Sequence, residues 1–182
     1  MKFTSSQSER FFSLLAAAGL CVAAAQTLRA ASIDDPSCKV LLDATAKMEH
    51  TDNHQYVTID RNGAKDIEGE SIQVGDTSYI KVGDAWKVSP LSPKDSAEQR
   101  KENIRNAKVF TCKYERDEMV DGEAAAVYKT HQESEDVIAD AELWISKSRG
   151  LVLKEVVSHP DDKQSIVVRV DYTNVQKPVV TK

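Results

Sequence analysis

The stretch from residue 137 to residue 146 reads Val-Ile-Ala-Asp-Ala-Glu-Leu-Trp-Ile-Ser and alternates more clearly than any other part of the chain. Successive side chains of a strand point to opposite faces, so one face of this stretch would be apolar. That face would carry Val137, Ala139, Ala141, Leu143 and Ile145. The other face would carry Asp140 and Glu142, with Ile138 and Trp144 as apolar exceptions. The pattern predicts a half-buried strand with one dry face and one mostly wet face.

Similar short strands flank this stretch on both sides. Downstream, a last strand shows the same alternation through Ile166, Val168, Val170 and Tyr172. Upstream, apolar runs separated by Gly-Asp and Asp-Gly turns predict strands over residues 56–59, 72–74, 79–82, 85–88, 109–115 and 124–130. Runs of antiparallel strands with few helices predict an α+β domain whose sheet curls around its helices.

Two helices are predicted from their starts. Asp35-Pro36 places an N-cap residue before a proline at the first helical position, and apolar residues at helical spacing continue to about residue 49. Ser92-Pro93 has the same pattern of an N-cap residue followed by proline. The residues after it, 94–106, are highly charged and include few apolar positions. The second segment is therefore either a thin, exposed helix or an ordered loop.

The first 31 residues have the three parts of a secretory signal peptide: a polar, net-basic start, an apolar run and a stretch of small residues. Cleavage is expected between Ala25 and Ala31. The apolar run is shorter than the roughly 20 residues needed to span a bilayer as a helix, and no later stretch replaces it. We expect the mature chain, residues 32–182, to be a single periplasmic domain without a transmembrane segment.

Composition argues against several classes of function. The chain of 182 residues is 41% hydrophobic and 29% charged, with a net charge of -5. An acidic surface repels phosphate backbones, so we do not expect nucleic-acid binding. The sequence has no Gly-rich phosphate loop and no nucleophile or zinc-protease motif, so we expect neither an enzyme nor a cofactor. His50 and His54 are the best metal candidates, but the spacing places no third ligand with them, and we predict no metal site.

Cys38 and Cys112 are the two cysteines that remain after export. An even pair in an oxidising compartment usually forms a bridge, so we predict a disulfide between them. Two buried free thiols are the alternative. No C-x-x-C motif suggests a redox enzyme.

Four segments of the chain, in this order and after the first helix, resemble the LolA/LolB/LppX superfamily of periplasmic lipoprotein carriers and sorting proteins. They are residues 86–90 (Trp-Lys-Val-Ser-Pro), 121–128 (Asp-Gly-Glu-Ala-Ala-Ala-Val-Tyr), 141–154 and 171–175 (Asp-Tyr-Thr-Asn-Val). The resemblance covers about residues 37–176. It implies an unclosed, strongly curved antiparallel sheet, a half-barrel, with helices on its concave side. It also implies an apolar cavity between them that accepts acyl chains.

On that basis the predicted cavity wall combines the apolar faces of the two alternating strands, with the small Ala139 and Ala141 leaving room for a ligand. The full set is Val137, Ala139, Ala141, Leu143, Ile145, Ile166, Val168, Val170, Tyr172 and Trp86. Trp86 and Tyr172 would either pack in the core or form the wall or mouth of the cavity.

Two functions follow from the sequence. The first is an exported carrier or sensor that holds an acyl chain, a lipid or a lipoprotein between sheet and helices. The alternative is a non-enzymatic protein of the same fold whose cavity is filled by its own side chains. That protein would act on a partner in the cell envelope, with the charged segment 94–106 as a docking surface.

Overall fold

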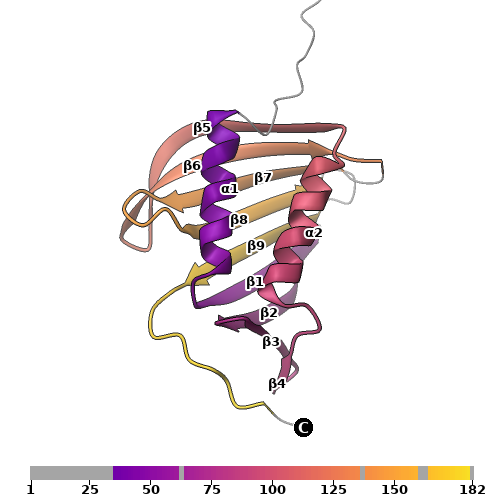
Figure 1. Ribbon diagram of the computed structural model, residues 1–182, viewed down its shortest axis with the longest axis vertical. Coiled ribbons are helices and arrows are strands. Elements are labelled where there is room, and N and C mark those ends of the chain that lie inside the picture. The colour runs from indigo at the N-terminus through magenta and orange to yellow at the C-terminus, as the bar shows by residue number, and fades with distance from the viewer. Residues whose placement is uncertain (1–34, 62–63, 136–137, 160–163, 181–182) are drawn as a thin grey trace, which may run out of the picture.

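The structure, a computed structural model, describes residues 35–61, 64–135, 138–159 and 164–180. The predicted signal peptide, residues 1–31, lies outside the described residues, as does Val137 of the predicted cavity wall. The described residues form two helices and one sheet of nine antiparallel strands. Figure 1 shows the sheet curving behind the two helices, which lie side by side across its concave face. The fold is α+β, as the alternation and the superfamily resemblance predict.

The strands pair in the order β4-β3-β2-β1-β9-β8-β7-β6-β5, so β4 and β5 form the two edges of the sheet and the sheet does not close. Pairing of the first strand with the last joins two antiparallel meanders into one sheet. The strands are β1 (Asn53–Arg61), β2 (Ala64–Val74), β3 (Thr77–Val82), β4 (Ala85–Val88), β5 (Val109–Val120), β6 (Glu123–Glu133), β7 (Ile138–Ser146), β8 (Val152–His159) and β9 (Gln164–Asp171).

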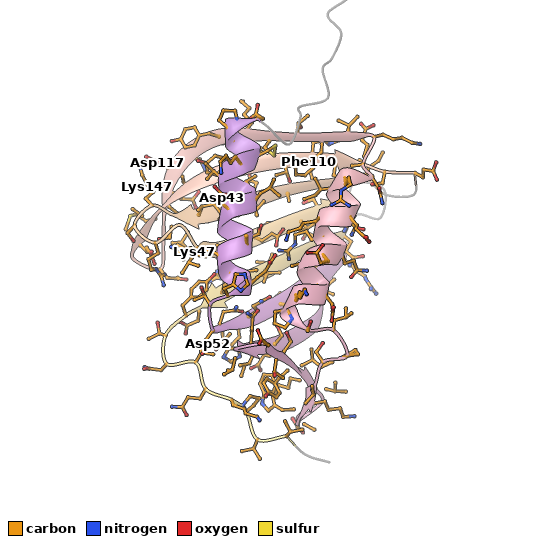
Figure 2. All side chains as sticks on the ribbon, in the orientation of Figure 1. Asp43, Lys47, Asp52, Phe110, Asp117 and Lys147 are labelled. Atoms are coloured by element: carbon orange, nitrogen blue, oxygen red, sulfur yellow. A yellow bond between two sulfur atoms is a disulfide. The ribbon has the colours of Figure 1, made fainter. Side chains whose placement is uncertain are left out.

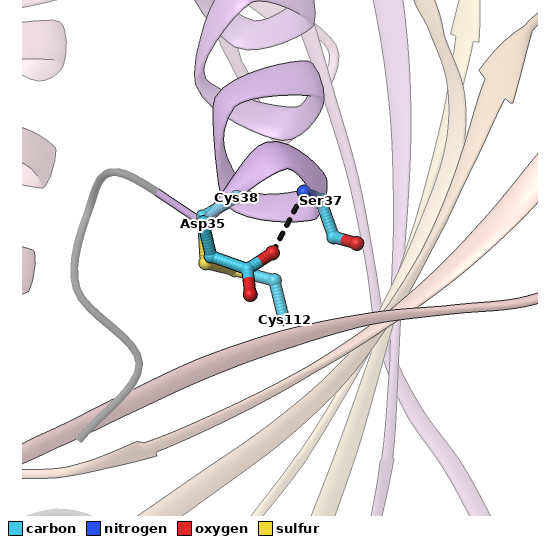
Figure 3. The surroundings of a disulfide bond; sticks show 4 residues. All are labelled: Asp35, Ser37, Cys38 and Cys112. Atoms are coloured by element: carbon cyan, nitrogen blue, oxygen red, sulfur yellow. Dashed lines mark hydrogen bonds between the residues drawn. A yellow bond between two sulfur atoms is a disulfide. The ribbon is translucent and has the colours of Figure 1, made fainter. Parts of the chain in front are cut away.

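The first helix, α1 (Pro36–Glu49), begins as predicted. The Asp35 carboxylate accepts a hydrogen bond from the backbone N–H of Ser37 at 2.8 Å, which satisfies one of the free N–H groups of the first turn. The predicted disulfide between Cys38 and Cys112 is confirmed, and it ties the start of α1 to β5 at the sheet edge (Figure 3). The apolar stripe of α1 packs into a buried cluster of Cys38, Leu41, Ala44, Cys112, Leu143, Ile145 and Val152.

The charged segment forms a helix rather than a loop. This helix, α2 (Pro93–Arg105), starts with a capping box in which Ser92 and Asp95 bond to each other's backbone N–H groups. Only Pro93 and Ala97 are buried. Because most helical stability in proteins comes from a buried apolar face, α2 is held in place less firmly than α1.

The outer, convex face of the sheet has a small core of its own. Trp144 is buried there with Ala125, Val127 and Leu153, and the Lys154 ammonium lies 4.1 Å from the centre of its ring. Trp144, predicted as an apolar exception on a mostly wet face, is therefore buried in a cluster on that face. The small Ala125 and the β-branched Val127 leave room for the indole, and lysine covers it from the solvent side.

Glu123, at the start of β6, anchors the turn that follows β7. Its carboxylate accepts hydrogen bonds from the Arg149 guanidinium and from the hydroxyls of Ser146 and Ser148. These donors, Arg149 first, lower the pKa of Glu123 from its ordinary value of 4.5 to about 2. The group is thus more acidic in the folded chain than in the unfolded chain, so its contribution to stability is complete above its unfolded pKa and is lost as the pH falls toward 2.

We therefore expect acid to destabilise the wild-type chain more than the Glu123→Gln variant. Between about pH 5 and pH 2, the free energy of unfolding of the wild type should fall by roughly 1–2 kcal/mol more, after allowance for solvent screening of a partly exposed pair. Urea titrations across this range measure the difference. Glu98→Gln, which removes only an exposed pair with Lys101, is the control and should behave like the wild type. If the free energy of unfolding falls with pH to the same extent in the wild type and in Glu123→Gln, Glu123 does not make the predicted contribution to acid sensitivity.

Candidate ligand cavity

A cavity with a volume of about 190 Å³ lies between the two helices and the concave face of the sheet. Its floor comes from β5, β6, β7 and β8, and its two sides come from α1 and α2. Phe110, labelled in Figure 2, lies on β5 between the two helices as seen in that view. The lining residues are Leu41, Leu42, Thr45, Arg100, Asn103, Ile104, Phe110, Thr130, Gln132, Ala139, Ala141, Leu143, Glu155 and Val157.

Strand register explains why the floor is formed by these residues. Ala141 is paired with Val157, and Val157 with Ile166. In the next row, Leu143 is paired with Glu155. Directly paired residues of antiparallel strands point to the same side of a sheet, so both rows face the helices.

Seven of the ten predicted wall residues divide into three groups. Ala139, Ala141 and Leu143 line the cavity. Ile145 is buried beneath α1 in the cluster around the disulfide. The β9 residues of the prediction share the concave face but lie beyond the cavity lining, and they are Ile166, Val168 and Val170.

Trp86 and Tyr172 lie outside the lining of this cavity, and their place at the wall or mouth of a ligand site stays a prediction. β9 ends at Asp171, so the alternation does not continue to Tyr172, whose hydroxyl donates a hydrogen bond to the carbonyl of Val152 at 2.6 Å. Its ring packs against the Trp144 cluster. Trp86 lies on the edge strand β4, where its ring centre is 6.1 Å from that of His54.

Both helices supply cavity residues that were not part of the predicted wall. The α1 residues are Leu41, Leu42 and Thr45, and the spacing of Leu41 and Thr45 along one helix face was visible in the sequence. Arg100 and Ile104 of α2 show the same four-residue spacing. A charged segment such as α2 gives no sequence signal that it covers an apolar cavity.

Glu155 is another lining residue outside the predicted wall, and it is the only carboxylate among the lining residues. Its neighbours across the strands are Leu143 and Val168, and within the described part of the chain its carboxylate makes no hydrogen bond or ion pair. Burial raises the pKa of Glu155, and the charge of Arg100 on α2 partly opposes this rise. The cavity therefore contains one carboxyl group that is poorly solvated and has no direct partner.

A groove between the helices, with a volume of about 350 Å³, adjoins the cavity and shares Leu42, Thr45, Arg100 and Ile104 with it. The rim of this groove is charged: acidic on α1, basic on α2. The rim residues are Asp43, Glu49, Lys101 and Arg105. A ligand longer than the cavity could thus continue between the helices toward solvent.

A larger opening, of about 670 Å³, lies on the outer face of the sheet. Its charged side chains already pair with one another: His131 Nδ1 lies 2.7 Å from Asp140 Oδ1, and Lys129 Nζ lies 3.4 Å from Glu142 Oε1. Paired surface charges of this kind are ordinary features of a solvated strand face. The cavity under the helices is the better candidate site, because apolar side chains form most of its wall.

Among the residues that the structure describes, no group of three or more His, Cys, Asp or Glu side chains is placed to hold a metal ion. His54 instead contacts Glu70 at 3.1 Å and the Tyr56 hydroxyl at 3.1 Å. In the same ranges, neither helix combines the length and the apolar character that crossing a membrane requires.

Fold and cavity together define a half-barrel protein, in which an unclosed antiparallel sheet holds two helices and a hollow between them. No protein-family model and no curated protein matches the sequence. Similar solved structures include LprF from Mycobacterium bovis, with 12% identity over 78% of this chain and 93% of that chain and a TM-score of 0.46. The Mycobacterium tuberculosis lipoprotein LppX is also similar, with 13% identity over 79% of this chain and 94% of that chain and a TM-score of 0.43.

A LolA superfamily protein from Nitrosomonas europaea is also similar, with 9% identity over 80% of this chain and 97% of that chain and a TM-score of 0.34. The likeness to these structures concerns the general course of the chain.

Proposed function

We propose that this chain is an exported, extracytoplasmic protein that binds an apolar ligand between its helices and its sheet. The ligand would be an acyl chain, a lipid or a lipid-modified protein, and the protein would act as a carrier or sensor and not as an enzyme. The observation that supports this most is the cavity with an apolar wall from both layers, including Leu41, Phe110 and Leu143. The small side chains of Ala139 and Ala141 leave space above the sheet that larger side chains would fill.

The hydrophobic effect is large enough for such binding. Each methylene moved from water into an apolar site contributes about 0.8 kcal/mol, so ten methylenes contribute about 8 kcal/mol before the costs of association. Those costs consume several kcal/mol, which leaves affinities in roughly the millimolar range for ten methylenes, and each further methylene that is buried tightens binding about fourfold. No nucleophile, metal or nucleotide is needed for this function.

The weakly anchored α2 supports the same proposal. Its buried residues are Pro93 and Ala97, and its last turn contacts the sheet through a hydrogen bond of 3.4 Å from Gln132 to the Asn103 carbonyl. A helix with so few buried contacts moves at low cost. The cavity could therefore widen toward the groove to admit a longer chain.

Displacement of a neutral fluorescent probe, N-phenyl-1-naphthylamine, by linear alcohols from hexanol to tetradecanol tests the proposal. We expect affinity to rise about fourfold for each added methylene until the cavity and groove are filled, and then to level off. Solvent extraction of protein purified without detergent, followed by mass spectrometry, should recover a co-purified lipid. A protein that neither takes up the probe nor carries lipid, or that binds all alcohols equally, would rule out ligand binding in the cavity.

A further inference from the structure

We infer that Glu155 makes the cavity selective for amphiphiles that carry an amino group next to their apolar chain. This inference rests on the proposed function and specifies the class of ligand. Glu155 lies on β8, a central strand of the sheet, and lines the cavity. Its carboxylate is the one acidic group in a cavity whose floor is otherwise apolar or neutral.

The row of residues across the sheet shows how isolated this carboxylate is. Tyr128, Leu143, Glu155, Val168 and Val57 are successive paired neighbours on β6, β7, β8, β9 and β1. Two residues further along β8, Val157 also faces the cavity. A carboxylate in such a row loses solvation that its neighbours do not replace.

Arg100 on α2 is the positive charge that acts on Glu155 from the helix side of the cavity. It lines both the cavity and the groove, and its side chain is exposed. Within the described ranges no ion pair joins Arg100 to Glu155. The guanidinium therefore opposes the rise in the pKa of Glu155 without forming a direct contact with its carboxylate. A ligand therefore finds an acidic group inside the cavity and a basic group at the mouth.

An ammonium group satisfies the carboxylate in both charge and hydrogen bonding. Hydrogen bonds to charged groups are stronger than those between neutral groups, and a poorly solvated site strengthens them further. The hydroxyl of an alcohol can donate one hydrogen bond to Glu155 but supplies no charge. The carboxylate of a fatty acid would place a second acidic group beside the first, which is unfavourable.

The test compares three ligands with the same chain: dodecylamine, dodecanol and dodecanoic acid. Each displaces N-phenyl-1-naphthylamine from the full mature chain near neutral pH, below its aggregation concentration. For the wild type we expect dodecylamine to bind at least about tenfold more tightly than dodecanol, and dodecanoic acid to bind most weakly. For Glu155→Gln, which keeps the shape of the side chain, the amine and the alcohol should bind within about threefold of each other.

Glu142→Gln is the matched control. Glu142 lies on the same sheet but points to the outer face, where it pairs with Lys129 and Arg116. This variant should keep the preference of the wild type for the amine. An unchanged dodecanol affinity in Glu155→Gln would show that the cavity is still formed.

The two proposals fail in different ways. If dodecanol does not displace the probe from the wild type, ligand binding in the cavity is wrong, and the inference about Glu155 fails with it. If dodecanol binds but dodecylamine binds no more tightly, the cavity is a ligand site and only the selectivity is wrong. The selectivity is also wrong if Glu155→Gln keeps the preference for the amine.

Discussion

Replacing both Cys38 and Cys112 with alanine should lower the free energy of unfolding by up to about 4.5 kcal/mol. The bridge joins residues 74 positions apart, and without it the unfolded chain gains the entropy of a long open loop. Both sulfurs are also buried in the cluster under α1, so their loss removes packing as well. Urea denaturation of the variant and the wild type measures the difference.

Reduction provides the control for this prediction. A reducing agent should destabilise the wild type to a similar extent and leave the alanine variant unchanged. Because the bridge holds the start of α1 against β5, the reduced wild type should also bind the fluorescent probe more weakly. Equal stability of the wild type with and without reducing agent would show that the bridge does not constrain the chain.

Filling the cavity with a larger side chain is expected to weaken ligand binding strongly. Ala141→Phe places a ring on the floor between Phe110 and Leu143, where an acyl chain would lie. If the ligand loses the room for three or more methylenes, affinity should fall by roughly 100-fold. Because the ring enters existing space, we expect stability to change by less than the roughly 1–3 kcal/mol typical of overpacking.

Probe titration and urea denaturation of the same variant separate loss of binding from loss of folding. Ala124→Phe is the control, because Ala124 is an exposed residue of β6 outside the cavity lining. It should retain the binding of the wild type. A normally folded Ala141→Phe variant that binds the probe as tightly as the wild type would place the ligand elsewhere.

Elements set by local chemistry were predicted well from the sequence. The start of α1 at Pro36 depends on Asp35 and on the proline itself, which act on their own turn of backbone. The same holds for the start of α2 at Ser92 and Pro93. The predicted pairing of the cysteines depended on compartment and number, and the structure confirms it.

Elements whose limits depend on a partner strand were predicted less well. β5 was expected over residues 109–115 but continues to Val120, because pairing with β6 resumes after an irregularity between Tyr114 and Arg116. The last strand was expected to include Tyr172, but β9 ends at Asp171. Hydrogen bonds between strands set these limits, and alternation within one strand does not report them.

The cavity depends on contacts that are still more distant in the sequence. Alternation placed Ala139, Ala141 and Leu143 on one face, but it could not distinguish them from Ile145, which is buried under α1 rather than beside the hollow. Glu155 interrupts an apolar run in the sequence and gives no sign of lying in a cavity. Alternation marks Trp144 as an apolar exception on a wet face, but it does not show which residues bury the ring.

The sequence by itself determined which side chains share a face of each strand, where the helices begin and which cysteines pair. These properties follow from the geometry of a few neighbouring residues or from the chemistry of the compartment. Tertiary structure alone decided which apolar residues surround a cavity and which fill a core, and it placed Arg100 and Glu155 on opposite layers of that cavity. The reason is that a cavity belongs to the space between layers, and that space is set by how two helices cross a curved sheet formed by strands distant in sequence.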